Sequence, residues 1–336
     1  MTSLFFGDTP EIARYDVLAY PQLDRLTERQ NSLFWRETAT DVSLDKAQFE
    51  SLSEAEQHIF TSNLKYQILL DTIQGREPVT TFLPHASVPE LETMLTAWAY
   101  FETIHSRAYT HIIRNIYNDA SEVFDTIMDI PEIQERSKTI NKYYDDFKQN
   151  PNIDTLYLCL NQVNVLEGVR FYASFACSFA FAERALMTGN ANIIKLIARD
   201  ENTHLAMTQA MIKILRKQHP ELEAKHSESV YDMFQQATEQ EAEWADYLFS
   251  KGTMLGLNAD ILKTYTEYIC NTRLRALGML PLYPVNTNPL PWISAWLNSD
   301  SVQVAPQESE ISSYLESQLD TSLDIMAFAS DYSKII

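Results

Sequence analysis

Glycine, cysteine and positive charge are all scarce in this chain of 336 residues. Its seven glycines are too few for glycine-rich phosphate loops or for a β fold with many turns, and they favour long helices. Its three cysteines, Cys159, Cys177 and Cys270, exclude a disulfide-stapled secreted scaffold. Its 26 Lys and Arg against 46 Asp and Glu give a net charge of −20, which excludes a basic nucleic-acid-binding protein because a phosphate backbone would be repelled.

Long apolar runs are missing too. Residues 1–10 contain no basic region followed by an apolar run, so we expect no signal peptide. The longest apolar run, residues 171–182, is shorter than the roughly 20 residues that span a bilayer, and it predicts a buried core helix. Together with the unpaired cysteines, these observations predict a soluble cytoplasmic protein that binds neither membrane nor nucleic acid.

Helical periodicity is what the sequence does contain. A capping box at Ser53 and Glu56 opens a helix that ends at Gly75. Further helices are predicted over residues 89–116, 121–147, 155–187, 192–218, 229–251 and 260–277. No alternating strand pattern appears in the middle of the chain, so the predicted fold is all-α. The last 30 or so residues lack a sustained period, and we divide the chain into a helical domain, 1–305, and a flexible tail, 306–336.

Glu-x-x-His motifs carry the candidate chemistry, because this spacing places both side chains on one helix face, where they can bind one metal ion. The motif occurs three times, as Glu102/His105, Glu201/His204 and Glu223/His226. The third copy lies among charged residues just after Pro220, which predicts a solvated surface stretch. The first two copies lie in apolar helices, where an unpaired Glu or His would be costly to bury.

A carboxylate on the preceding helix accompanies each of these two motifs. Asp71 precedes Glu102, and Glu167 precedes Glu201 at a similar spacing. The chain thus repeats a unit of one helix with a carboxylate and one helix with Glu-x-x-His. This is the ligand pattern of a ferritin-like four-helix bundle that holds two metal ions, although the first acid is Asp instead of the usual Glu. Oxygen-rich ligands with two imidazoles suit iron or manganese, and do not suit a closed thiolate zinc site.

Five segments resemble the radical-generating small subunit of class I ribonucleotide reductase, most closely the class Ia type. They are NLKYQILLDTIQGREP, ETIHSRAYTHIIRNI, RFYASFACSFAFAER, LIARDENTHL, and NPLPWI followed by VAPQESE. The resemblance covers residues 33–314. It implies a ribonucleoside-diphosphate reductase subunit whose dimetal-carboxylate site activates dioxygen to generate a stable tyrosyl radical. A large subunit then uses this radical to reduce ribonucleotides to deoxyribonucleotides.

The resemblance also assigns residues to these tasks. It implies two iron ions per chain, with manganese as an alternative at one or both positions. The ligands of the first ion would be Asp71, Glu102 and His105, and those of the second Glu167, Glu201 and His204. Tyr109 matches the radical tyrosine, and it lies about one turn beyond His105 on the same helix face.

Other matching residues concern the surroundings of the radical and its transfer. Trp35, Asp200 and Tyr314 match the family's relay to the large subunit, with His105 linking Asp200 to the metal. Apolar residues that match the lining of the radical pocket are Phe171, Phe175 and Ile197. Trp98 matches a tryptophan near the site, although simple packing explains it equally well. The resemblance further implies a homodimer, an external electron donor, and docking of the tail on the large subunit.

Three other functions remain open on the residues alone. A ferritin-type ferroxidase is compatible with the ligand set, but the length of the chain and the tail with Tyr314 count against it. A diiron monooxygenase would require an open hydrophobic cavity beside the metals. A non-catalytic scaffold would leave six buried ionisable groups without a metal, which would make it unstable.

Overall fold

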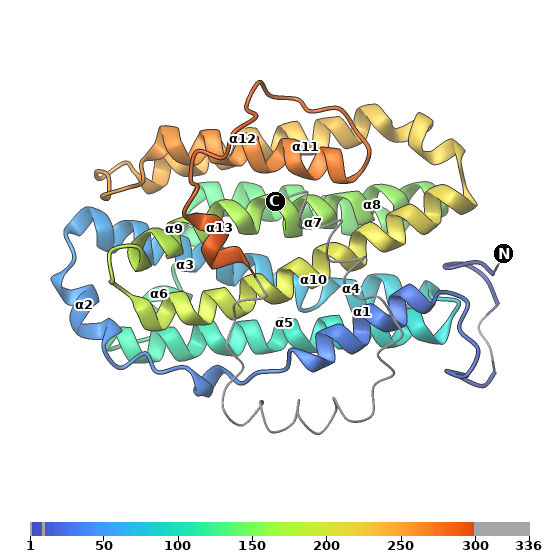
Figure 1. Ribbon diagram of the computed structural model, residues 1–336, viewed down its shortest axis with the longest axis horizontal. Coiled ribbons are helices and arrows are strands. Elements are labelled where there is room, and N and C mark those ends of the chain that lie inside the picture. The colour runs from blue at the N-terminus through green and yellow to red at the C-terminus, as the bar shows by residue number, and fades with distance from the viewer. Residues whose placement is uncertain (1, 9–10, 299–336) are drawn as a thin grey trace.

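Helices make up the described fold. The computed structural model describes residues 2–8 and 11–298, and over these ranges it contains helices, connecting loops and two isolated bridges, but no β-strand. The long helices run along the long axis of the molecule (Figure 1). The all-α prediction is therefore confirmed. The predicted boundary at residue 305 and the predicted tail, 306–336, lie outside the described residues.

The helical elements follow one another in a simple order. They are α1 (Pro21–Ser32), η1 (Glu37–Ala39), α2 (Asp45–Ser51), α3 (Glu54–Gln74), α4 (Glu77–Phe82), η2 (Leu83–His85), α5 (Pro89–Ile116), α6 (Ser121–Phe124), η3 (Ile127–Asp129), α7 (Pro131–Gln149), α8 (Ile153–Val165), η4 (Leu166–Arg170), α9 (Phe171–Ala182), α10 (Thr188–Gln218), α11 (Glu221–Leu248), α12 (Ala259–Ala276) and α13 (Ile293–Leu297). Most are α-helices, η1 to η3 are short 3₁₀ turns, and η4 is a π turn.

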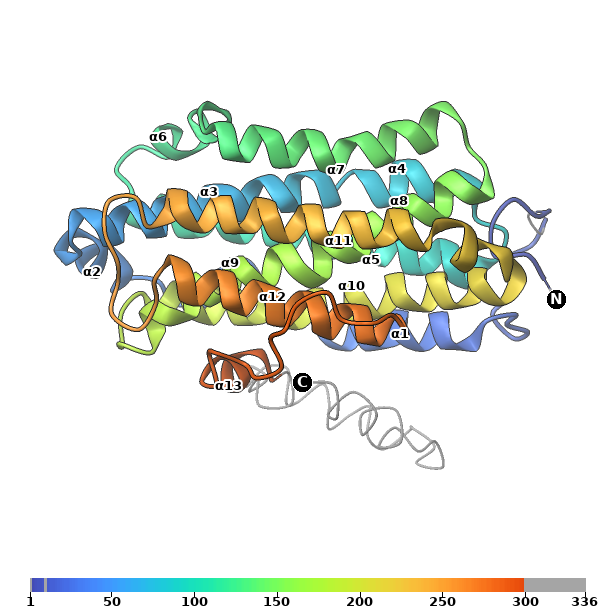
Figure 2. The ribbon, with the colours of Figure 1, turned by 90° about the horizontal axis from the view of Figure 1, so that it is seen from above.

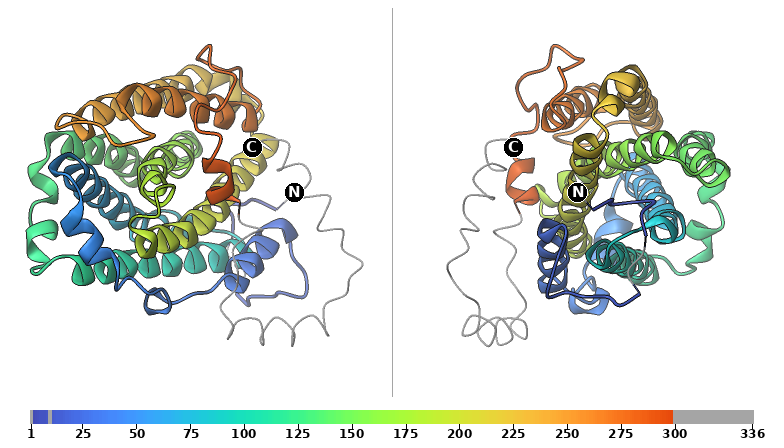
Figure 3. Two further views of the ribbon diagram at one scale, coloured as in Figure 1. Left: turned by 60° about the vertical axis from the view of Figure 1, so that its left-hand side comes forward. Right: turned by 90° about the vertical axis from the view of Figure 1, so that its right-hand side faces the viewer.

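A bundle of four long elements forms the centre. Helix α3 packs against α5 and α9, while α10 packs against α5, α8 and α9. Segments α8, η4 and α9 form one continuous helix, so these contacts close a ring of four. Helices α1, α7, α11 and α12 lie outside this ring, as the view from above and the view along the long axis show (Figure 2 and the right panel of Figure 3). The four central elements are those on which the sequence predicts the metal ligands.

Local signals explain where the two first bundle helices begin. At the start of α3, the Ser53 hydroxyl accepts a hydrogen bond from the Glu56 amide, and the Glu56 carboxylate accepts one from the Ser53 amide. This capping box satisfies two amides that have no partner inside the helix. Helix α5 begins with Pro89, whose fixed φ suits a first helical position. Both starts agree with the sequence prediction.

Four helix predictions have wrong boundaries. The helix predicted over residues 155–187 ends at Ala182, five residues early, and Met187 caps the next helix. Residues 121–147 do not form one helix, since α6 ends at Phe124 and α7 begins at Pro131, which suits a first turn but not a helix interior. Helix α11 begins at Glu221, directly after Pro220, eight residues before the predicted start. Helix α10 begins at Thr188, four residues early, because the buried Asp45 carboxylate accepts hydrogen bonds from amides in its first turn.

The continuous helix over Ile153–Ala182 is long and apolar enough to cross a membrane by length and composition, but its apolar window is completely buried inside the protein. This agrees with the predicted core helix. The π turn within it was not predicted, and it carries Glu167. Such turns are frequent at functional sites.

Candidate metal centre

Six ionisable side chains converge inside the bundle, and all six are fully buried. They come from four elements, with Asp71 on α3, Glu102 and His105 on α5, Glu167 on η4, and Glu201 and His204 on α10. They form two groups, and within each group the ligand atoms lie within 4.8 Å of one another. The first group is Asp71, Glu102, His105 and Glu201, and the second is Glu102, Glu167, Glu201 and His204. Glu102 and Glu201 belong to both groups, so each would be placed to contribute to either member of a pair of ions.

Metal ions fit this cluster, because seven buried polar atoms of these side chains have no hydrogen-bond partner. The atoms are both oxygens of Asp71, Glu102 Oε2, His105 Nδ1, Glu167 Oε2, Glu201 Oε1 and His204 Nε2. Buried polar atoms without partners are expensive, and coordination would satisfy those that face the cluster. His204 faces the carboxylates with Nδ1, 3.1 Å from Glu102 Oε1, so its Nε2 is not one of these. Four carboxylates would also nearly balance two divalent ions, and the mixture of oxygen and imidazole donors suits iron or manganese. The set brought together is the set predicted from the sequence.

Crowding shifts the pKa values of the cluster in opposite directions. Burial, with the charge of Glu102, raises the pKa of Asp71 to about 6 and that of Glu201 to about 8. Burial and the Glu201 carboxylate raise the pKa of Glu167 well above its usual value. Burial opposes ionisation of Glu102, but the two histidines outweigh it and lower its pKa. Without metal, the folded cluster therefore retains protons at neutral pH.

The metal-free protein is expected to lose stability as the pH rises from about 4 to about 8. Asp71 and Glu201 have folded-state pKa values of about 6 and about 8, above their unfolded values of about 4. The folded state therefore binds more protons in this window, and its stability falls as the pH rises through the folded-state pKa values. Hydrogen bonds from His105 to carboxylates overcome the effect of burial and raise its pKa as well, which adds to the same trend.

Thermal unfolding of chelator-treated protein at about pH 5 and about pH 9 checks this expectation. Glu102 shifts in the other direction, but its window lies below this range. The metal-loaded protein is the control, since its carboxylates are already deprotonated and metal binding releases their protons. A midpoint that stays level or rises with pH in the metal-free protein would contradict the description of the cluster.

Asp200 connects the cluster to an indole ring. Its Oδ2 accepts a hydrogen bond from Trp35 Nε1 at 2.7 Å and lies 3.1 Å from His105 Nε2. The bond to Asp200 occupies Nε2 of His105 and leaves Nδ1 facing the carboxylates, 3.1 Å from Glu201 Oε1. The rings of Trp35 and His105 stack at 6.3 Å between centroids. Trp35 and Asp200 of the predicted relay, together with His105, thus form a continuous buried chain. Tyr314 lies outside the described residues.

Tyr109 is fully buried on α5, and its hydroxyl interacts with the Asp71 carboxylate without a hydrogen bond of ordinary length to any described residue. Burial raises the pKa of Tyr109 well above its usual value, and the negative charge of Asp71 raises it further. The phenol is therefore protonated at neutral pH. Phe171, Phe175 and Ile197 are likewise fully buried, and the first two rings stack at 5.7 Å. All four side chains are closed off from solvent, and that the last three line the pocket of Tyr109 stays a prediction.

Two hydrogen bonds to the cluster go beyond the sequence analysis, which treated Trp98 as possible packing and did not identify Gln74. Trp98 Nε1 donates to Glu102 Oε1 at 2.8 Å, so this tryptophan does more than pack. Gln74 Nε2 donates to Glu167 Oε1 at 2.5 Å, and Gln74 Oε1 accepts from the buried Tyr144 hydroxyl at 2.8 Å. Gln74 lies one turn after Asp71 on the same helix, which was the available signal. Each of these two glutamates therefore has one oxygen held by a protein N–H group.

The third Glu-x-x-His motif belongs to the scaffold. Its His226 is only 9% exposed and lies 2.7 Å from Asp154 Oδ1, so the prediction of a solvated stretch is wrong for this residue. Its Glu223 has a side chain that is 52% exposed and pairs with Arg216 at 3.3 Å, as a surface residue does. Neither residue belongs to a metal-binding group within the described part of the chain.

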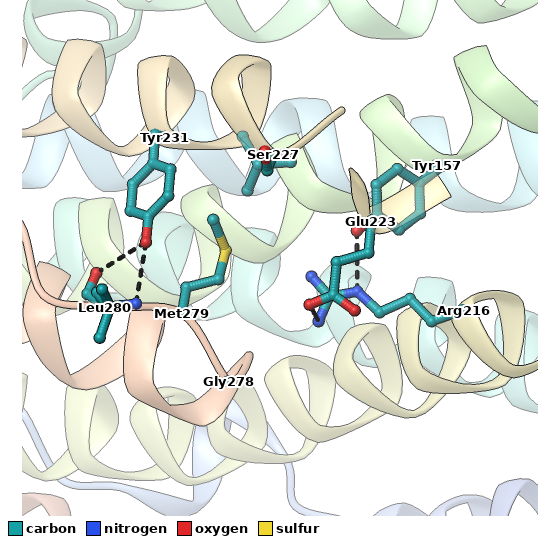
Figure 4. Close-up of a pocket in the computed structure, with 9 residues that line it drawn as sticks. Tyr157, Arg216, Glu223, Ser227, Tyr231, Gly278, Met279 and Leu280 are labelled. Atoms are coloured by element: carbon teal, nitrogen blue, oxygen red, sulfur yellow. Dashed lines mark hydrogen bonds and ion pairs between the residues drawn. The ribbon is translucent and has the colours of Figure 1, made fainter. Parts of the chain in front are cut away.

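A surface pocket of about 210 Å³ lies beside this third motif (Figure 4). Arg216 Nε donates to the Tyr157 hydroxyl at 2.9 Å on one side of it, and the Tyr231 hydroxyl bonds the backbone of Leu280 on the other. The lining includes Glu223, and none of the six cluster residues belongs to it. The polar groups of the pocket bond to one another or to the backbone, and these bonds account for their positions. We therefore look for the chemistry in the cluster inside the bundle.

Comparison with known proteins decides the family. Residues 14–289 match the family model described as "Ribonucleotide reductase, small chain". The chain belongs to the ribonucleotide reductase small-chain family. It is 50% identical over 350 residues to the ribonucleoside-diphosphate reductase 1 subunit beta of Escherichia coli O157:H7, covering 96% of this chain and 93% of that protein. It is 49% identical over 354 residues to the subunit beta of Haemophilus influenzae (strain ATCC 51907 / DSM 11121 / KW20 / Rd), covering 97% and 94%.

A solved structure of the ribonucleotide reductase small-chain family supports the fold as well. The R2 subunit of ribonucleotide reductase from Clostridium botulinum superposes with a TM-score of 0.84 at 26% identity, covering 88% of this chain and 94% of that one. The predicted ferritin-like fold and the predicted function as an oxidoreductase subunit are therefore confirmed. The ferroxidase, monooxygenase and scaffold alternatives are set aside on the same ground.

Proposed function

We propose that this chain generates a stable radical at Tyr109 with a dimetal centre and supplies it for the reduction of ribonucleoside diphosphates. The observation that carries the proposal is the pair of buried ligand groups that share Glu102 and Glu201, together with a buried tyrosine on the helix that bears Glu102. As a small chain of this family, the protein works with a large subunit and as a dimer. Reduction of the nucleotide itself then belongs to the large subunit.

The assignment of ligands follows the two groups. Asp71 and His105 would hold the first ion and Glu167 and His204 the second, while the two glutamates shared by the groups would contribute to both. We assign iron to both positions, with manganese as the alternative that the same donors accept. When bound, the metal pair supplies dioxygen activation and a one-electron oxidant for a nearby phenol.

The residues around Tyr109 determine what the oxidation requires. Because its phenol is protonated before oxidation, loss of the electron has to be accompanied by transfer of the phenolic proton, for which the Asp71 carboxylate that interacts with this hydroxyl is the acceptor, leaving a neutral tyrosyl radical. The apolar and fully buried surroundings exclude water and external reductants, which lengthens the life of this radical. Trp98 and Gln74 each donate to one carboxylate oxygen, of Glu102 and of Glu167 respectively, and so fix how these two carboxylates face the cluster.

Transfer of the radical is the second part of the proposal. The buried chain from His105 through Asp200 to Trp35 provides hydrogen bonds at 3.1 and 2.7 Å for coupled movement of an electron and a proton. We assign Tyr314 as the next relay residue and the tail, 306–336, as the segment that docks on the large subunit. Activation also needs an external electron donor, and we place the enzyme in the cytoplasm.

Electron paramagnetic resonance tests the proposal directly. The metal-free protein is loaded anaerobically with Fe(II) and exposed to dioxygen, and Mn(II) is tried in parallel. The expected result is about two ions per chain and a tyrosyl radical signal in at least one loading. Bound and oxidised metal without a radical would contradict the radical-generating function and favour an oxidase or ferroxidase. Failure to bind any metal would contradict the ligand assignment itself.

A further inference from the structure

The π turn η4 interrupts a regular helix at the residue that supplies a cluster carboxylate. Glu167 is the second of its five residues, with α8 before it and α9 after it. A π turn is rare and has poorer packing along the helix than an α turn, so it persists only where the surrounding structure favours it. The contacts that surround η4 therefore determine the direction of the Glu167 side chain.

Arg273, on α12, reaches the backbone of this turn. Its Nε donates a hydrogen bond to the Gly168 carbonyl oxygen at 2.9 Å, and its guanidinium lies 4.3 Å from the centre of the Tyr172 ring. The absence of a side chain at Gly168 makes this approach possible. A Cβ there would lie 3.1 Å from both Arg273 Cγ and Leu205 Cδ1, tighter than ordinary packing allows. The arginine thus lies directly on the peptide group that follows Gly168, one residue beyond Glu167.

Arg170, the last residue of η4, is held from another direction. Its guanidinium is fully buried and donates to Glu241 Oε1 at 2.9 Å and to Gln240 Oε1 at 2.6 Å, both on α11. The Tyr66 hydroxyl donates to the same Glu241 oxygen at 2.5 Å, and Arg136 Nε lies 3.4 Å from it. A single buried carboxylate therefore organises two guanidinium groups, an arrangement that tolerates little movement.

We propose that Arg273 and Arg170 are positioning residues that hold the π turn and so direct Glu167 towards the second metal ion. Arg273 bonds the backbone of η4, and Arg170, its last residue, ties η4 to α11. Neither arginine takes the place of a ligand. The inference rests on the proposed role of Glu167 as a ligand. It also gives a function to α11 and α12, which lie outside the four-helix ring (Figures 1 and 3). These two helices carry the residues that anchor η4.

Calorimetric titration of the metal-free full-length protein with Mn(II), which measures the affinity for each ion, tests the inference. Arg273→Met removes the donor to Gly168 and keeps an unbranched side chain. It is expected to weaken binding of the second ion about tenfold or more, the scale at which supporting residues act, while the first ion is bound as before. Arg273→Lys retains a donor and is expected to stay within about threefold of the original affinity. Arg275→Gln, an exposed position on the same helix, is the matched control.

Hydrogen exchange of the metal-free protein supplies a measurement that does not depend on metal. Arg273→Met is expected to accelerate exchange of the amides of residues 166–170, whereas Arg275→Gln should not. If Arg273→Met does not fold, Gly168→Ala tests the same contact from the other side, since its Cβ would press on Arg273. The same two signatures, a weaker second ion and faster exchange at η4, are then expected.

Other outcomes would overturn the inference. Unchanged affinity and exchange in Arg273→Met would do so, as would equal weakening of both ions together with a general loss of stability. A lysine variant as defective as the methionine variant would show that the bond to Gly168 is not the cause. Glu167→Gln separates this inference from the ligand assignment. If it leaves both ions fully bound, the ligand assignment fails; if it weakens the second ion while Arg273→Met does not, only the positioning role fails.

Discussion

Tyr109→Phe is expected to abolish the stable radical while leaving the metal centre and the fold intact. The substitution removes one oxygen atom. That hydroxyl makes no hydrogen bond of ordinary length among the described residues, and its one interaction is a longer one with Asp71, so little is left unsatisfied. Phenylalanine is much harder to oxidise than tyrosine, and the metal pair is then left without its electron donor. Ribonucleotide reduction with the large subunit should fall by roughly 10³-fold or more, as it does when a group that takes part directly in the chemistry is removed.

Three measurements on the same samples check this result: the tyrosyl signal, the metal content and the unfolding midpoint. Tyr100→Phe is the matched control, because Tyr100 lies on the same helix but is 55% exposed. It should retain both the signal and the activity. A tyrosyl signal that persists in Tyr109→Phe would place the radical on another tyrosine. Loss of metal from Tyr109→Phe would mean that the hydroxyl supports the centre itself.

Four of the six cluster residues could be predicted because their pattern is local, whereas Asp71 and Glu167 were found through the repeated pair of helices and the family resemblance. Glu102 and His105 are one turn apart on one helix, and the same pattern recurs in α10, so helical periodicity alone places each pair on a common face. The start of α5 at Pro89 could be predicted for a similar reason, since proline is a first-turn residue. Features encoded within about four residues of chain are accessible to this kind of reasoning.

Features that depend on distant parts of the chain were not accessible. The early start of α10 requires the Asp45 carboxylate, which lies far away in the sequence and accepts its first amides. The π turn at Glu167 has no periodic signature, and its anchor Arg273 lies on another helix. Gln74 carried a weak signal through its spacing from Asp71, but only the fold shows that it bonds Glu167 on a different helix. Tertiary contacts decide each of these cases.

Trp35→Phe is expected to separate storage of the radical from its use. The substitution removes the indole N–H group that donates to Asp200 Oδ2 at 2.7 Å, while Asp200 keeps its contact with His105 at 3.1 Å. Metal affinity should therefore change by no more than about tenfold. Phenylalanine cannot be oxidised by a tyrosyl radical, so turnover per stored radical should fall by roughly 10³-fold. The measurement is ribonucleotide reduction with the large subunit, divided by the radical content of the same sample.

A second substitution and a control decide whether this loss reflects the relay. Tyr314→Phe lies outside the described residues and far along the chain from the cluster, so it should reduce turnover per radical to the same degree without any change in metal binding. Trp244→Phe is the control, because Trp244 is also buried but its Nε1 has no hydrogen-bond partner in the described structure. Normal turnover in Trp35→Phe would exclude this tryptophan from the route. If Tyr314→Phe were active while removal of residues 306–336 abolished turnover, the tail would dock the large subunit without carrying the radical, since docking needs its contacts whereas transfer needs an oxidisable ring.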